Sequence, residues 1–530
     1  MTTDSAYDIV IIGGGINGCG IARDAAGRGL RVFLAEQDDL ASATSSWSTK
    51  LIHGGLRYLE QYAFRLVRES LQEREVLLRL APHIIHPLTF VLPHERSMRP
   101  ALMIRAGLFL YDHIGGKISL TRSRGINFPH PQYSQGLLPR LKKGFTYSDA
   151  TVDDARLTVL NAMSARDHGA TIATRLRVCG GQREAVQTHS HSPSQSQSQS
   201  QSQSQPLWQL QLTHTLTGVK TTVRAKAVVN AAGPWVKQLL DLGFADVAAE
   251  SVAGVKLVKG SHIIVPSIHS EDHAYILQND DGRVVFVIPY EGQYSLIGTT
   301  DVAVNTVEEG HQISEAEIRY LLRAVNRFFA RAIHAEDVVW SYTGVRPLYD
   351  DGELNPAEIT RDYVLKVNDH NGAAPLLSIY GGKITTYRRL AEHVLDELAP
   401  YFPNTATSWT ATQALPGGEL DDGMTMAMFA KTLMRQHIGV APDFIARLVA
   451  RHGVNARVIL KTTRSMDDLG ETFGRGLNLL CEREIDYLMA HEWAMTADDI
   501  LWRRTKCGLH MDRDERQRAT AFIDRRCADV

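Results

Sequence analysis

Three glycines and one acidic residue near the start of the chain have the spacing of a dinucleotide-binding site. The glycines lie in the loop Gly13-Gly14-Gly15-Ile16-Asn17-Gly18, and Glu36 follows about 18 residues after the last of them. Gly13 allows a tight turn, Gly15 lets the backbone approach a pyrophosphate, and Gly18 lets the next helix pack closely. Glu36 is placed to accept hydrogen bonds from the adenosine ribose. We therefore predict that an adenine dinucleotide is bound by Gly13, Gly15, Asn17, Gly18 and Glu36.

The elements around this loop support that interpretation over the alternative of a purely structural glycine turn. Residues 7–12 form an apolar run typical of a central parallel strand buried on both faces. A helix over about 17–28 would direct its N-terminal amides at the phosphates, and residues 31–35 form the second strand. A later strand over 225–233 ends in small residues, where the backbone at Ala232 and Gly233 can again approach the cofactor. The alternative for this last segment is a plain core strand.

Length and composition are those of a soluble enzyme of about three domains. The chain has 530 residues, 57 basic and 59 acidic side chains, and a formal charge of -2, which does not indicate nucleic-acid binding. Its five scattered cysteines predict neither a disulfide framework nor a metal site, and fit a reducing cytoplasm. The N-terminus lacks the pattern of a signal peptide. The best apolar run, 101–111, is broken by Arg105 and is too short to span a bilayer.

The glycine loop alone does not distinguish a flavin from a nicotinamide, because both cofactors use this fold. Seven further segments resemble, in the same order along the chain, those of the FAD-dependent glycerol-3-phosphate dehydrogenase family, closest to its bacterial respiratory members. They are 43–60, 229–236, 259–262, 298–301, 343–348, 360–363 and 381–388. The resemblance covers about residues 7–506 and lacks the calcium-binding extension of the mitochondrial members. It implies a non-covalent FAD.

The resemblance also implies a reaction. sn-Glycerol 3-phosphate would be oxidised to dihydroxyacetone phosphate by hydride transfer from C2 to flavin N5, and the electrons would pass to a membrane quinone, either ubiquinone or menaquinone. An oxidase that reduces oxygen instead is an open alternative. A flavin-binding regulatory protein without turnover and an NAD-dependent dehydrogenase are less favoured, the latter because no second nucleotide fold is evident.

Fixed cations must replace the water around the substrate phosphate, and guanidinium groups suit this task. Arg57, Arg346 and Lys383 lie in three of the matching segments, each beside glycine or proline. Arg361 is a fourth candidate, although any of these cations can also be an ordinary surface charge. Tyr58 is a candidate hydrogen-bond donor to the substrate, with packing against the core as its alternative.

The substrate hydroxyl also needs a base with a pKa near neutrality. We predict His262, which follows Lys259-Gly260-Ser261 and begins the apolar run 263–266. His53 is the rival base, but its position in the flavin segment suits a cofactor contact better. The alternative for a single strand histidine such as His262 is a structural role.

The resemblance implies the remaining cofactor contacts. The ring system would lie near Thr44, Ser45, Ser46, Lys50, Leu51, His53 and Gly54, and the adenine near Val178. Residues expected to close over the ring or the ribityl chain are Gly344, Gly382, Lys383 and Thr385. A helix over 385–398 would direct its N-terminal amides at the flavin carbonyl edge.

The predicted fold class is α/β: a Rossmann-like FAD-binding domain of the glutathione-reductase and D-amino-acid-oxidase type, a β-rich substrate domain and an α-helical C-terminal domain. The FAD-binding domain would comprise 1–85, 140–255 and 340–400, and the substrate domain 86–139 and 256–339. Residues 283–289 and 293–298 read as antiparallel strands. Helical spacing at 424–436, 443–452, 481–491 and 497–505 assigns 401–530 to the helical domain.

Three segments bear on partners. The Ser/Gln tract at 187–206 predicts a disordered hairpin tip. The apolar and basic run 99–113 fits either a membrane-surface helix or a buried amphipathic one. Arg503, Arg504 and Lys506 would attract anionic lipid or form a solvated helix face. We expect a cytoplasmic protein attached peripherally to the inner face of the cell membrane, with a homodimer as one open alternative.

Overall fold

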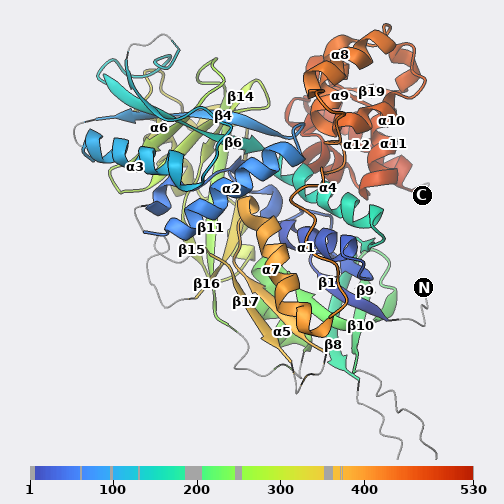
Figure 1. Cartoon of the computed structure of the whole chain (residues 1–530). Coiled ribbons are helices and arrows are strands. Elements are labelled where there is room, and N and C mark those ends of the chain that lie inside the picture. Colours follow the sequence, from blue (N-terminus) through green and yellow to red (C-terminus); the bar gives the residue numbers. More distant parts are fainter. Residues whose placement is uncertain are drawn as a thin grey trace, which may run out of the picture.

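The computed structural model describes residues 6–59, 62–95, 99–128, 132–184, 206–244, 247, 253–350, 362–369, 372 and 374–528. This part of the chain forms two large β-sheets with helices packed on them, and a helical body built from C-terminal residues (Figure 1). Arg361 and the Ser/Gln tract, apart from Pro206, lie outside the described residues. Within the described part, we find no helix that combines the length and apolar character needed to cross a bilayer.

The first sheet contains the predicted dinucleotide fold. Its strands have the order β17-β18-β10-β1-β2-β7, with β9 on β10 and β8 on β9. Strands β18, β10, β1, β2 and β7 are parallel, whereas β17, β8 and β9 pair in antiparallel fashion. The bounds are β1 (Tyr7–Ile12), β2 (Val32–Ala35), β7 (Thr171–Ala173), β8 (Leu176–Arg183), β9 (Trp208–His214), β10 (Lys220–Asn230), β17 (Val364–Asn368) and β18 (Leu376–Tyr380).

Strand β1 lies in the middle of this sheet because both of its faces are apolar. Ile9 and Ile11 belong to a core shared with helices α1 (Ile16–Gly27), α4 (Asp154–Asp167) and α7 (Tyr387–Leu398). Val10 and Ile12 belong to a second core, which includes Trp208 of β9. The sequence prediction of a strand buried on both faces, followed by a glycine loop and a helix, is confirmed.

The second sheet is larger and mostly antiparallel. Its order is β15-β11-β14-β13-β12-β4-β6-β3, with β16 on β11 and β5 on β6. The predicted antiparallel pair is present as β13 and β14. The bounds are β3 (Leu51–Ile52), β4 (Ile85–His94), β5 (Arg124–Asn127), β6 (Lys143–Val152), β11 (Val255–Pro266), β12 (Ala274–Gln278), β13 (Val284–Tyr290), β14 (Tyr294–Gly298), β15 (Val302–Val304) and β16 (Trp340–Tyr349).

Helices cover both faces of the second sheet. Helix α6 (Glu315–Asn326) shares one apolar core with it, and α2 (Phe64–Leu80) and α3 (Ala101–Ile114) share another. Helix α5 (Val236–Gly243) packs instead on the first sheet. Strands β3, β6 and β16 come from segments that we predicted for the FAD-binding domain, yet they are hydrogen-bonded in the second sheet. The chain therefore passes between the two sheets more often than those predicted domain bounds imply.

The C-terminal body has its own apolar core, as the helical spacing predicted. Its elements are α8 (Met426–Gln436), α9 (Pro442–His452), α10 (Ala456–Leu460), α11 (Glu482–Glu492), α12 (Arg513–Ala528) and the short strands β19 (Thr472–Phe473) and β20 (Leu480–Cys481). The segment predicted as a helix over 497–505 forms the π-helical turn η12 (Asp499–Arg504). Figure 1 shows this body beside the helices of the first sheet.

The prediction that Arg503, Arg504 and Lys506 form a solvated or lipid-attracting face is wrong. These side chains are buried, with exposed fractions of 6%, 0% and 4%. Each is paired with an aspartate outside the C-terminal body, either Asp39 or Asp153. A count of charges along the sequence does not reveal partners that lie hundreds of residues away.

Candidate active site

The glycine loop is packed too closely for side chains at Gly13 and Gly18. Gly13 has a φ of +112°, and a Cβ on it would lie 2.5 Å from the Ala231 carbonyl oxygen. A Cβ on Gly18 would lie 1.9 Å from the Gly13 carbonyl oxygen, so α1 begins as close to the loop as predicted. The buried Oδ1 atom of Asn17 has no hydrogen-bond partner among the described residues. The N-terminal amides of a helix that begins at this glycine loop fit the phosphates of a bound dinucleotide.

Glu36 follows strand β2 beside this loop, where the sequence predicted a ribose acceptor. Its Oε2 accepts from the Gly14 amide at 2.6 Å, and its Oε1 accepts from the Asp38 amide at 2.8 Å. Burial raises the pKa of Glu36 to about 7, although both amides oppose that shift. Val178 is buried in β8, in the same core as the end of β2. Ala232 and Gly233 follow β10, at the carboxyl end of a strand parallel to β1.

The segment 44–54 links the two sheets at the predicted flavin position. Ser45 Oγ accepts from the Ile16 amide at 2.9 Å, so this segment contacts the start of α1. Thr44 Oγ1 donates to the Val345 carbonyl at 2.7 Å, beside Gly344 of β16. A Cβ on Gly344 would lie 2.8 Å from the Trp47 carbonyl oxygen, which explains the glycine there. The remaining predicted contacts are Ser46, which is buried at the C-terminal end of the same turn, and Leu51, which begins β3.

The Lys50 ammonium group is paired with other groups of the protein. Its Nζ atom lies 2.7 Å from Asp154 Oδ1 and 2.8 Å from the Ser46 carbonyl oxygen, and the residue is 5% exposed. A direct contact of Lys50 with the flavin stays a prediction. The ammonium group of Lys50 pairs with Asp154 at the start of α4. This ion pair holds the segment 44–54 against that helix.

His53 contacts the loop before α7, although the two segments lie far apart in the chain. The His53 amide donates to Thr385 Oγ1 at 3.3 Å, and Gly54 donates its amide to Tyr111 Oη at 2.8 Å. Burial lowers the pKa of the His53 imidazole, and the nearby Lys383 charge adds to this effect. Thr385 lies in a short 3₁₀ turn before α7, so the predicted helix begins two residues later.

The same loop returns to the start of α1. Asn17 Nδ2 donates to the Gly381 carbonyl at 3.4 Å. Gly382 has a φ of +103°, and a Cβ on it would lie 2.9 Å from Asn17 Nδ2. Glycine is therefore required where this loop meets the dinucleotide loop, and the described residues at both ends of the predicted site fit FAD.

His262 lies in the interior of the second sheet. Its Nε2 is 3.0 Å from Thr49 Oγ1, and its ring stacks on Tyr342 with centroids 4.8 Å apart. Its buried Nδ1 has no hydrogen-bond partner in the described part of the chain. Burial, followed by the positive charges of Lys50 and Arg346, holds the pKa of His262 well below its usual value. The imidazole is therefore neutral at pH 7, but its pKa lies below the near-neutral value that we expected of the base.

Arg346 lies one strand away from His262, on β16. Its Nη2 is 2.9 Å from Asp301 Oδ1 and donates to the Thr300 carbonyl at 3.2 Å. A Cβ on Gly260 would lie 2.4 Å from this Nη2, so the guanidinium passes directly over the β11 backbone. The Arg346 side chain remains 31% exposed, which leaves it within reach of a ligand.

Lys383 and Tyr58 form a second cationic position. Lys383 Nζ lies 3.8 Å from the centroid of the Tyr58 ring, a cation–π contact. Arg57 precedes Tyr58 in the 3₁₀ turn η2 (Leu56–Leu59) and is half-buried. The structure thus brings Tyr58 and Lys383 together, whereas a shared site for Arg57 stays a prediction.

Sequence reasoning missed Asp301, and also Thr49 and Tyr342, which contact His262. Asp301 follows β14 in the segment 298–301, which we recognised for its resemblance without giving any member a role. The available signal was an acidic side chain placed just after a strand whose partner strand carries His262. Nothing in the sequence connected it with Arg346, 45 positions further along the chain.

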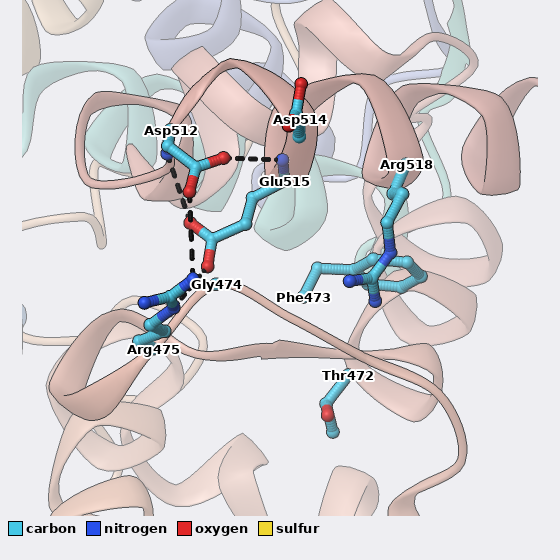
Figure 2. Close-up of a pocket in the computed structure, with 8 residues that line it drawn as sticks. All are labelled: Thr472, Phe473, Gly474, Arg475, Asp512, Asp514, Glu515 and Arg518. Carbon is cyan, nitrogen blue, oxygen red and sulfur yellow. Dashed lines mark hydrogen bonds and ion pairs between the residues drawn. The ribbon is translucent and has the colours of Figure 1, made fainter.

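A pocket of about 330 Å³ lies in the C-terminal body, and none of the residues that line it was predicted for the site (Figure 2). Arg475 Nε lies 2.7 Å from Glu515 Oε1 there, and the Arg475 side chain is 83% exposed. Opposite charges that already satisfy each other at the surface do not indicate a ligand.

Comparisons with known proteins agree with this architecture. Residues 8–388 match a family profile described as FAD dependent oxidoreductase, and residues 408–525 match one described as C-terminal domain of alpha-glycerophosphate oxidase. The aerobic glycerol-3-phosphate dehydrogenase of Escherichia coli strain K12 is 46% identical, with 97% of each chain covered. The D-erythritol 1-phosphate dehydrogenase of Brucella abortus strain 2308 is also 46% identical, over 99% of this chain and 98% of that protein.

A solved structure extends the likeness to three dimensions. The glycerol-3-phosphate dehydrogenase from Bacillus halodurans, complexed with FAD, superposes with a TM-score of 0.71 and is 25% identical. The match covers 99% of this chain and 95% of that one.

Proposed function

Because the chain belongs to the glycerol-3-phosphate dehydrogenase family of FAD-dependent oxidoreductases, we propose that it oxidises sn-glycerol 3-phosphate at C2 to dihydroxyacetone phosphate. The observation that carries this proposal is that the buried imidazole of His262 lies two residues along β11 from Gly260, over which the Arg346 guanidinium passes. A base and a phosphate-binding cation in one site are what the oxidation of a phosphorylated alcohol requires.

His262 takes the proton of the C2 hydroxyl in this proposal. Its surroundings disfavour a positive charge before substrate arrives, and the dianionic phosphate then offsets that cost. Bound FAD would supply the two-electron acceptor, taking the C2 hydrogen with its electron pair at N5. The Thr49 hydroxyl, 3.0 Å from Nε2, fixes the orientation of the ring. Tyr342 supports one face of the imidazole by stacking.

Arg346, Lys383 and Arg57 bind the phosphate, and Tyr58 donates to the phosphate or a substrate hydroxyl. Asp301 and the Thr300 carbonyl hold the Arg346 guanidinium in one orientation before substrate arrives. A cation that is already oriented loses less conformational freedom on binding. Arg361 remains a predicted fourth contact outside the described residues.

A four-carbon substrate is the second candidate, because the relative named D-erythritol 1-phosphate dehydrogenase is as similar as the Escherichia coli protein. Purified enzyme should be assayed with equal concentrations of both phosphates and a soluble quinone. We expect the higher kcat/KM for glycerol 3-phosphate. A preference for D-erythritol 1-phosphate would replace the proposed substrate while leaving the chemistry in place.

The outer surface of α3 supports a membrane contact, and a membrane quinone is the electron acceptor that we propose. Leu102, Met103 and Phe109 on this helix are 82%, 58% and 59% exposed, and Arg105 and His113 lie among them. Exposed apolar residues with basic neighbours are typical of helices that lie in a membrane surface. We therefore propose peripheral attachment to the inner face of the cell membrane.

Parallel assays of ubiquinone reduction and hydrogen peroxide formation test the proposed quinone acceptor. Peroxide as the main product would make the protein an oxidase.

A further inference from the structure

Two arginines of the C-terminal body reach into the first sheet and end on a single carboxylate. Arg503 Nε lies 2.7 Å from Asp39 Oδ2, and Arg504 donates to both Asp39 oxygens at 2.7 Å. Asp39 and Arg504 are fully buried, and Arg503 is 6% exposed. These pairs join residues that are more than 460 positions apart in the chain.

Asp39 belongs to the loop that follows Glu36, the residue predicted to accept from the adenosine ribose. It lies three positions after Glu36, and the Ala41 amide donates to the Gly14 carbonyl at 3.1 Å. Leu40 approaches the same glycine, since a Cβ on Gly14 would lie 2.9 Å from Leu40 Cδ2. The loop over 36–41 therefore contacts the phosphate-binding backbone on one side and carries the ribose acceptor on the other.

The same π-helical turn holds this loop from a second direction. Asp499 of η12 accepts from Arg175 Nη2 at 2.9 and 2.8 Å. The Arg175 amide in turn donates to the Asp38 carbonyl at 2.9 Å. Strand β8 begins next to Arg175, and the Leu176 amide donates to the Glu36 carbonyl at 2.7 Å.

These contacts connect the docking of the C-terminal body with the shape of the adenosine site. A buried carboxylate is tolerated only while it is paired, so Asp39 must move toward water when its arginines are removed. Glu36 and the Gly14 contact lie on the same short loop and would move with it. The loop over 36–41 is held at two points, Asp39 and the Asp38 carbonyl, so it has little freedom to adjust at one point alone.

We propose that Arg503 and Arg504 are positioning residues for the cofactor, through which the C-terminal body keeps the adenosine end of the FAD site in its binding shape. The contribution is to FAD retention and does not depend on which substrate is oxidised. It gives the C-terminal body a part in cofactor binding without a contact to FAD.

The test is the rate of FAD release from the purified holoenzyme, followed by the rise in flavin fluorescence. The variants are Asp39→Asn, Arg504→Met and the two combined. Asp24→Asn is the matched control in the first sheet's helices, because Asp24 is buried and paired with Arg28 at 2.6 Å. Glu484→Gln is the control in the C-terminal body, where Glu484 pairs with Arg451 at 3.0 Å. Each protein is measured at the same interval below its own unfolding midpoint, taken from circular dichroism.

We expect Asp39→Asn and Arg504→Met to release FAD about tenfold faster or more, and the double variant to release it no faster than the faster single variant. Both controls should stay within about threefold of the wild type even where they lower the unfolding midpoint. Release from Asp39→Asn no faster than from the controls would overturn the proposal. If Arg504→Met does not fold, Arg503→Lys, which keeps the charge but loses the geometry of the guanidinium, gives the second measurement.

Discussion

The proposed chemistry depends on two side chains whose state or orientation is set by their neighbours. Burial and nearby cations lower the pKa of His262 and keep it neutral, whereas Asp301 holds the Arg346 guanidinium in place. A neutral base next to a fixed cation favours the deprotonation of an alcohol that carries a phosphate. The two positions can be tested separately.

Replacing His262 by Asn should slow flavin reduction by glycerol 3-phosphate by about 100-fold or more, since a positioned base contributes on this order. The amide keeps a polar group near Thr49 but has no useful basicity. Stopped-flow absorbance of the flavin measures the rate, and the flavin-to-protein ratio should stay near that of the wild type. A rate within about twofold of the wild type would assign the base elsewhere, with His53 as the next candidate.

Arg346→Ala should lower kcat/KM for glycerol 3-phosphate by about 10- to 100-fold, which corresponds to the loss of a charge-assisted hydrogen bond. The matched control is Arg224→Ala, which removes a partly exposed arginine paired with Glu184 at 2.7 Å on the first sheet. The control should leave kcat/KM unchanged. Loss of FAD from Arg346→Ala would mean that the residue binds the cofactor and not the substrate.

Single residues were predictable from sequence only where a local pattern fixes them. The glycine loop and Glu36 have such a pattern, and the structure places them together. Lys50 lies in a recognisable segment, but its partner Asp154 is about a hundred positions away and its pairing was not foreseen. Asp301 was missed for the same reason.

At the scale of elements, helix α3 carries the proposed membrane contact. Its inner residues Leu108 and Tyr111 are buried against the second sheet, while Leu102 and Phe109 face outward. The sequence left a buried helix and a surface helix equally open, because the apolar residues are distributed around much of its circumference. The structure shows that only one side is covered.

The combined change Leu102→Asp and Phe109→Asp should abolish most binding to vesicles that contain anionic lipid, because it places two charges in the proposed membrane-facing side. Flotation with the vesicles measures the bound fraction. Met428→Asp with Ile438→Asp is the control, since these residues of the C-terminal body are 52% and 87% exposed. Equal binding by the two double variants would contradict attachment through α3.

The connection between β11 and β12 should make stability depend on pH. His269 and His273 stack there with centroids 5.1 Å apart, and burial lowers the pKa of each to about 4. Above the unfolded pKa of about 6.5, both states are neutral and stability does not change. Below it, the unfolded chain binds protons that the folded protein excludes, so stability falls as the pH drops toward 4.

The loss between pH 6.5 and 4.5 should be about 2 kcal/mol for each histidine. Urea unfolding at several pH values measures it, and the variant His269→Gln with His273→Gln should show a flatter dependence over this interval. A variant with the same slope as the wild type would show that other groups cause the acid sensitivity.

At the scale of the whole molecule, the site is assembled from segments that lie far apart in the chain. Residues 13–18, 44–54, 259–262, 298–301, 343–346 and 381–385 come together only because the chain passes repeatedly between the two sheets. Local periodicity predicted β1, α1 and the helical C-terminal body well. It did not predict which strands share a sheet, since pairing between distant strands depends on the complete topology.

The most direct test of the proposed function is an anaerobic titration of the purified holoenzyme with sn-glycerol 3-phosphate, with the flavin absorbance recorded after each addition. Two electrons per substrate should bleach the oxidised flavin to completion, and dihydroxyacetone phosphate should form in an amount equal to the flavin reduced. The Arg346→Ala variant, with its FAD bound, should require much higher concentrations. A wild-type flavin that stays oxidised at saturating glycerol 3-phosphate would contradict the proposed function.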